Sequence, residues 1–90
     1  MKKGIQIEVF GLVQGVGFRY STKNKAIELG VKGTVENTKD WTVRITGFGD
    51  ESAIFAFLKW CHHGPPSSKV EKLEYNFIDW LDCESFEIKR

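Results

Sequence analysis

Apolar side chains alternate with polar or small ones in several short stretches of the chain. These stretches occupy residues 5–9, 31–37, 41–46, 73–77 and 86–88. A two-residue period is typical of a strand with one buried face, because successive side chains of a strand point to opposite sides. The pattern therefore predicts a strand at each stretch, the last of them short.

Two other segments carry side chains that suit a buried stripe at helical spacing. The first stripe consists of Phe18, Thr22, Ala26 and Leu29. The second consists of Ile54, Phe57, Leu58 and Cys61. Gly30 follows the first segment as a C-cap would, and Asp50 precedes the second as a plausible N-cap. The Gly64-Pro65-Pro66 sequence ends the second segment, so both segments are predicted to be helices.

The order of these elements predicts the fold class. Strand, helix, strand, strand, helix and strand follow one another, which is the split βαβ plan of ferredoxin-like α+β proteins. We expect a βαββαβ sandwich in which two helices cover one face of an antiparallel sheet of four to five strands. Residues 1–90 are too few for two separate cores, so they are expected to form one domain.

Charge and composition narrow the classes of partner. Lys and Arg number 13 against 12 Asp and Glu, a net charge of +1, whereas nucleic-acid binders of this size carry a marked basic excess. The chain has no apolar run long enough for a signal peptide or a membrane span. We therefore expect a cytoplasmic monomer with no nucleic-acid or membrane partner, in which Cys61 and Cys83 are reduced thiols.

Residues 11–20, GLVQGVGFRY, form a glycine-rich segment between the first strand and the first helix. We call this segment the glycine loop. Its backbone N–H groups, together with those of the first helical turn, offer an anion site, and Arg19 adds a permanent charge. The composition also fits a plain tight turn with a surface arginine. The segment matches neither the G-x-G-x-x-G nor the Walker A pattern.

Asn37 is brought to the same sheet edge by the predicted topology. The first two strands are parallel with the third between them, so their ends lie roughly 10 Å apart. By strand parity Asn37 faces the helices, where an unpaired amide would cost about 1–3 kcal/mol. It is either a ligand-site residue or a turn-capping asparagine that closes a hairpin at residues 38–40.

No other group of residues suggests a site. His62 and His63 are adjacent on a helix, so they cannot both face one metal ion, and they suit the helix C-terminus. Ser67 and Ser68 have no evident base beside them. We therefore expect no metal ligands and no cofactor.

The two segments that carry Arg19 and Asn37 resemble the signatures of the acylphosphatase family. GLVQGVGFRY resembles the first signature, G-x-V-Q-G-V-x-F-R, and GTVEN at residues 33–37 is similar to the second, G-[aromatic]-V-x-N. The resemblance extends over essentially the whole chain. It implies a small ferredoxin-like hydrolase that converts an acyl phosphate into a carboxylate and inorganic phosphate.

The resemblance also implies roles for individual residues. Arg19 would bind the substrate phosphate, and Asn37 would orient the attacking water. The backbone cradle for the phosphate would come from Gln14, Gly15, Val16, Gly17 and Phe18. The chain departs from the family pattern at Thr34, Glu36 and Trp41, which bear on hairpin shape and substrate preference.

The implied reaction suits these side chains. A carboxylate departs as an anion at neutral pH, because its conjugate acid has a pKa of about 4, so no general acid is required. Positioning and electrostatics provide most of the catalysis of phosphoryl transfer, and a guanidinium with backbone amides supplies both without a metal. The alternative is a non-catalytic ferredoxin-like module that binds RNA or a small anion.

Overall fold

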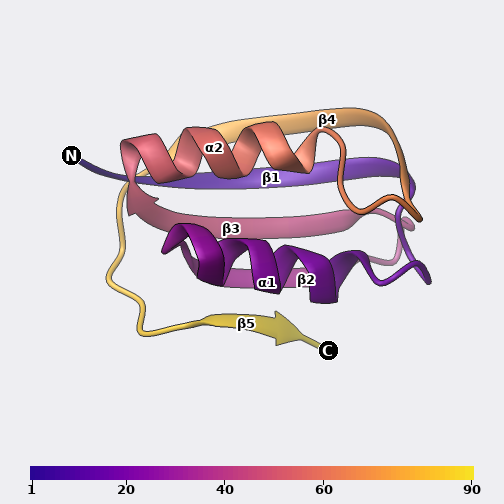
Figure 1. Ribbon diagram of the computed structural model, residues 1–90, viewed down its shortest axis with the longest axis horizontal. Helices are drawn as coiled ribbons and strands as arrows, with labels where there is room; N and C mark the ends of the chain where they lie inside the picture. Colours follow the sequence, from indigo (N-terminus) through magenta and orange to yellow (C-terminus); the bar gives the residue numbers. More distant parts are fainter.

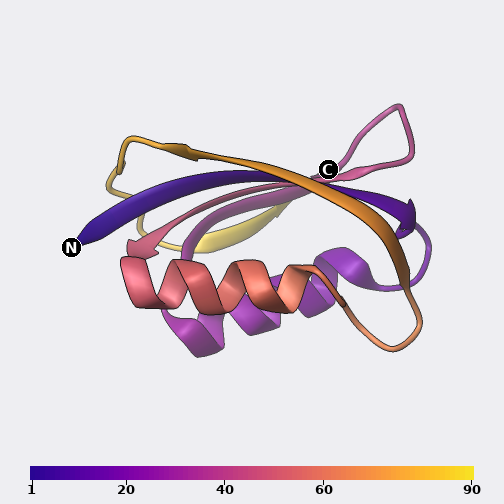
Figure 2. The same cartoon turned by 90° about the horizontal axis from the view of Figure 1, so that it is seen from above.

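The computed structural model describes residues 1–90 and contains two helices against one face of a five-stranded sheet (Figures 1 and 2). The elements are β1 (Lys2–Leu12), α1 (Phe18–Leu29), β2 (Lys32–Asn37), β3 (Val43–Asp50), α2 (Glu51–Cys61), β4 (Lys69–Ile78) and β5 (Phe86–Lys89). This confirms the predicted ferredoxin-like plan. Neither helix is long and apolar enough to cross a membrane.

The sheet has the strand order β4-β1-β3-β2-β5. β3 lies between β1 and β2 and is antiparallel to both, so the ends of β1 and β2 point to the same edge, as predicted. β5 is parallel to β2, so the expectation of an antiparallel sheet is wrong at this strand. The reason is that residues 79–85 carry the chain from β4 to the opposite edge of the sheet (Figure 1), where β5 starts beside the beginning of β2.

The core forms where the alternating strand positions meet the two helical stripes. Ile5, Ile7 and Val9 of β1 and Ile45 of β3 are almost fully buried in one core cluster with apolar residues of both helices. Burying one such side chain contributes about 1.5–3 kcal/mol, so these positions hold the layers together. Cys61 is also buried, which raises the pKa of its thiol well above the ordinary value and keeps it neutral.

Both predicted cap residues occupy cap positions of the helices. Gly30 follows α1 with a φ of 77°, the left-handed C-cap conformation that glycine favours. Asp50 occupies the N-cap position of α2, as predicted, but its side chain makes no capping hydrogen bond. The β1–β3 register places Asp50 opposite Lys2, and their charged groups are 3.9 Å apart.

Trp41 lies in the β2–β3 turn rather than in the third strand, which begins at Val43. Its φ of 67° makes it the chain's one non-glycine residue in the left-handed region, and its side chain is 74% exposed. The turn projects away from the helices (Figure 2). The strand prediction failed here because Trp41 shares the parity of Val43 and Ile45.

We expect Trp41→Gly to raise the free energy of unfolding by about 0.5–1 kcal/mol. Glycine avoids the left-handed penalty of about 1–2 kcal/mol, which exceeds its entropic cost of about 0.5–1 kcal/mol. Urea unfolding of the variant beside wild type measures the change. Trp41→Ala is the matched control, since it removes the ring but keeps the penalty; a loss of stability in both variants would mean that the ring packs usefully.

Candidate active site

The glycine loop adopts a backbone conformation that its glycines permit. Gly15 and Gly17 both have a φ of 76°, and no atom lies within 4 Å of a Cβ added at either position. These glycines are therefore required by backbone conformation and not by lack of space. No backbone N–H of residues 14–17 donates a hydrogen bond to another group of the protein. The loop thus presents unpaired donors immediately before the N-terminus of α1, an arrangement that suits an anion.

Arg19 is the second residue of α1 and is half-buried. Its guanidinium forms neither an ion pair nor a hydrogen bond with another side chain of the protein. It lines a pocket of about 240 Å³ together with Gly15, Gly17, Phe18 and Asn37. No acidic residue lines this pocket, so the charge of Arg19 is available to an anionic ligand.

Asn37 ends β2 and lines the same pocket. Its carboxamide oxygen Oδ1 is shielded from solvent and has no hydrogen-bond partner. A buried acceptor without a partner costs about 1–3 kcal/mol. The cost is explained if the oxygen is paired only when a ligand or an ordered water occupies the pocket.

Thr38, not Asn37, closes the β2–β3 turn. Thr38 Oγ1 accepts hydrogen bonds from the backbone N–H groups of Asp40, at 3.2 Å, and Thr42, at 3.3 Å. Asn37 makes no such bond, so its interpretation as a turn-capping residue is wrong. A role for Asn37 in binding a ligand stays a prediction.

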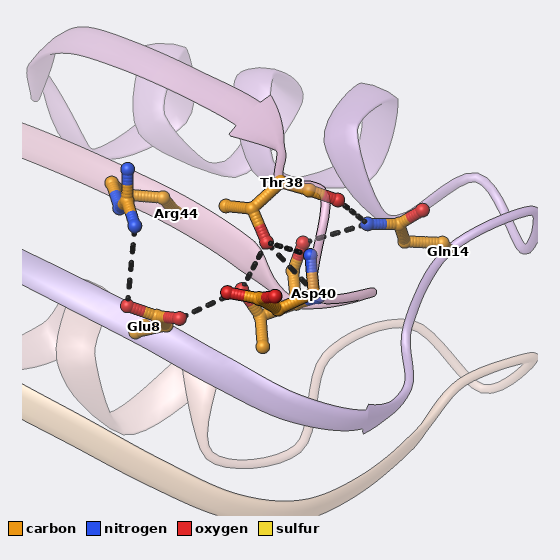
Figure 3. Close-up of polar contacts among 6 residues, drawn as sticks. Glu8, Gln14, Thr38, Asp40 and Arg44 are labelled. Atoms are coloured by element: carbon orange, nitrogen blue, oxygen red, sulfur yellow. Dashed lines mark hydrogen bonds and ion pairs between the residues drawn. The ribbon is translucent and has the colours of Figure 1, made fainter.

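Gln14 connects the glycine loop to the β2–β3 turn through its side chain. Its Nε2 donates to the backbone carbonyl oxygens of Thr38, at 3.0 Å, and Thr42, at 2.8 Å (Figure 3). Gln14 does not line the pocket, and neither does Val16. Only a backbone role was expected for Gln14. Its partners are 24 and 28 positions away in the chain, so no local pattern indicated this contact.

A chain of polar contacts fixes the turn to β1 (Figure 3). Thr42 Oγ1 donates to Glu8 Oε2 at 2.8 Å, and Glu8 also pairs with Arg44 at 3.6 Å. Thr42 Oγ1 has only one hydrogen, so in its 2.7 Å contact with Thr38 Oγ1 it must be the acceptor. The hydroxyl groups of Thr38 and Thr42 therefore each donate one hydrogen bond and accept at least one. The turn that Gln14 contacts is therefore held at a defined position over the sheet.

Removing the Gln14 carboxamide tests this connection. We expect Gln14→Ala to lower the free energy of unfolding by about 1–3 kcal/mol, since two hydrogen bonds are lost. We also expect the inhibition constant of inorganic phosphate to rise and kcat/KM for benzoyl phosphate to fall about tenfold. The reason is that the backbone N–H groups of a less firmly held loop are no longer kept in position. Gln6→Ala, at an exposed position of β1, is the control. Unchanged phosphate inhibition in Gln14→Ala would show that the connection does not position the loop.

Two further contacts hold the glycine loop from the side of α2. Ser67 Oγ donates to the carbonyl oxygen of Val16 at 2.7 Å. Phe18 is buried beside Trp60, with ring centroids 5.8 Å apart. A Cβ on Gly64 would lie 2.4 Å from the Phe18 ring, so this glycine, which lies in the turn after α2, makes room for Phe18. The contact of Ser67 was not predicted, because Ser67 and Val16 are 51 positions apart in the chain.

The departures from the family signatures lie away from the pocket. Val35 faces the core, so its neighbours Thr34 and Glu36 point to the opposite face of the sheet. Glu36 pairs there with Lys89 at 3.6 Å. Trp41 occupies a left-handed turn position, which is where glycine is conformationally favoured. None of the three lines the pocket of Arg19 and Asn37.

Comparisons with known proteins agree with this geometry. The acylphosphatase family model matches residues 5–88. An acylphosphatase of Mannheimia succiniciproducens is 47% identical over 81 residues, which cover 90% of this chain and 88% of the relative. The acylphosphatase structure from Bacillus subtilis has a TM-score of 0.93 and 34% identity, with both chains fully covered. That from Coxiella burnetii has a TM-score of 0.94 and 32% identity, with 98% and 93% covered. The chain therefore belongs to the acylphosphatase family.

Proposed function

We propose that the protein hydrolyses acyl phosphates to a carboxylate and inorganic phosphate, with Arg19 as the phosphate ligand and Asn37 as the residue that orients the water. One observation carries the assignment of residues. The unpartnered Oδ1 of Asn37 lines the same pocket as the unpaired guanidinium of Arg19 and the edge of the glycine loop. Such a pocket offers a bound phosphoryl group both charge and a positioned acceptor.

The phosphoryl oxygens are bound by groups that are already in place. The transition state of phosphoryl transfer spreads negative charge over three equatorial oxygens. The N–H groups of residues 14–17 and the Arg19 fork provide donors for them without reorganisation, which is the condition for strong electrostatic stabilisation. A guanidinium and amides thus supply the positive charge that a metal ion supplies in other phosphoryl-transfer sites. We expect activity to persist after exhaustive chelation.

Asn37 acts on the water and not on the proton. Its amide takes up no proton at neutral pH, but its Oδ1 accepts a hydrogen bond from a water and holds it in line with phosphorus. The water oxygen forms the new P–O bond as the bond to the acyl oxygen breaks, and the carboxylate leaves with the electron pair. Both water hydrogens remain with the inorganic phosphate. Holding the reactants in this geometry contributes several kcal/mol, of the order of 7–11 at best.

A benzoyl phosphate hydrolysis assay on wild type and Arg19→Ala tests the proposal. We expect wild type to accelerate hydrolysis equally before and after treatment with EDTA, with competitive inhibition by inorganic phosphate, and Arg19→Ala to lose the acceleration. Phosphate binding without turnover in wild type would support a non-catalytic anion-binding module instead. Loss of activity with EDTA and recovery with Mg²⁺ would contradict the metal-free mechanism.

A further inference from the structure

A second arginine lines the pocket of Arg19 and Asn37. Arg90 follows β5, which pairs in parallel with β2 in a register that places Lys89 beside Glu36. The same register, continued by one residue, brings Arg90 level with Asn37, and both residues line the pocket. Phe86 and Ile88 face the core, so by strand alternation Arg90 points to the same side of the sheet. The end of β5 lies at the same end of the molecule as the first turn of α1 (Figures 1 and 2).

The side chain of Arg90 forms no ion pair, unlike that of its neighbour Lys89. Lys89 pairs with Glu36 on the opposite face of the sheet, at 3.6 Å. Arg90 forms no ion pair with any acidic side chain, and no acidic residue lines the pocket. The residues that line the pocket therefore include two arginines and no aspartate or glutamate. Unpaired cations that converge on one pocket favour a ligand with more than one anionic group.

The two arginines differ in burial, since Arg19 is half-buried and Arg90 is exposed. The bottom is formed by buried groups, Val13, Phe18 and the Oδ1 of Asn37. Tyr20, which is 67% exposed, and Arg90, which is also exposed, belong to its mouth. A phosphoryl group at the bottom, against Asn37 and the glycine loop, leaves the acyl group to extend toward the mouth. Arg90 is then placed for the acyl group and not for the phosphoryl group.

We propose that Arg90 is a specificity-determining residue that binds an anionic group carried by the acyl moiety. The preferred substrates are then acyl phosphates with a second negative group, a carboxylate or a second phosphate, rather than uncharged acyl phosphates. This inference rests on the proposed function, since it assigns the phosphoryl group to the inner part of the same pocket. It adds the chemical class of the acyl group, which neither signature motif encodes.

A pair of synthetic substrates tests the inference. 3-Carboxybenzoyl phosphate and 3-carbamoylbenzoyl phosphate have nearly the same shape and differ in one negative charge. We expect wild type to have a kcat/KM about tenfold higher for the carboxylate, the scale of one charge-assisted hydrogen bond. We expect Arg90→Gln to abolish this preference and Arg90→Lys to keep part of it. Intrinsic differences in substrate reactivity cancel when each variant's ratio is divided by that of wild type.

Lys89→Gln is the matched control, because it removes the same charge one residue away on the opposite face of the sheet. It is expected to keep the wild-type ratio. An equal fall for both substrates in Arg90→Gln would assign Arg90 to the phosphoryl group and overturn the inference, as would a wild type without preference. If wild type hydrolysed neither compound nor benzoyl phosphate, the proposed function itself would fail, so the two failures are distinguishable.

Discussion

Replacing Arg19 with lysine is expected to lower kcat/KM for benzoyl phosphate by at least about 100-fold, the scale of losing one preorganised donor to a developing charge. Lysine keeps the positive charge, but its ammonium cannot reproduce the planar fork that meets two phosphoryl oxygens. Arg19 is half-buried and its side chain forms no ion pair or hydrogen bond within the protein, so the free energy of unfolding should change little. Steady-state kinetics and urea unfolding measure the two quantities.

Arg44→Lys is the control for this substitution. Arg44 is an exposed arginine of β3 that pairs with Glu8 and does not line the pocket. Its replacement should leave kcat/KM within about twofold, since an exposed ion pair contributes little. A near-normal rate in Arg19→Lys would mean that charge alone is sufficient and that the bidentate geometry has no role.

The Asn37→Ala substitution is expected to lower kcat by about 100-fold or more while KM changes little. The carboxamide is proposed to hold water rather than substrate, so its loss affects the transition state more than the ground state. The free energy of unfolding should stay unchanged or rise by up to about 1–3 kcal/mol, because the substitution removes a buried acceptor that has no partner. Loss of activity together with a gain of stability is the result that a purely structural residue would not give.

Asn76→Ala, at an exposed position of β4, is the matched control and should change neither property. If KM alone rose in Asn37→Ala, the residue would bind substrate and not water. If the variant were markedly destabilised, Asn37 would be a structural residue, and the assignment of the water site would be lost.

Much of the fold could be predicted because local pattern and final environment coincide. The apolar alternation of β1 and the stripes of α1 and α2 identify the residues that form the core. The prediction was less accurate where one local sequence feature is compatible with two different structures. Trp41 has the parity of a strand residue but occupies a turn, and Asp50 occupies the N-cap position of α2 but its carboxylate lies near Lys2 instead of capping the helix. The direction of β5 depends on a connection across the sheet, which has no local signal.

The candidate site was predictable in part, for a similar reason. The glycine loop and Asn37 lie at strand ends, so the topology alone brought them to one edge. The side-chain contacts of Gln14 and Ser67 join segments that are distant in sequence, so no local residue spacing predicts these contacts. The sequence did not indicate Arg90 as a residue of the pocket either, because its position depends on the parallel pairing of β5 with β2. Residues that hold the glycine loop in place, or that reach the pocket from a distant strand, are thus harder to predict from sequence than residues at the ends of the first two strands.

The most direct test of the central claim is hydrolysis of benzoyl phosphate in water enriched with ¹⁸O, followed by mass spectrometry of both products. The proposed mechanism has the water held by Asn37 attack phosphorus, so enzyme-catalysed turnover should place one ¹⁸O atom in inorganic phosphate and none in benzoate. Label in benzoate would mean attack at the carbonyl carbon. That result would contradict the assignment of the phosphoryl group to the glycine loop and of the water to Asn37.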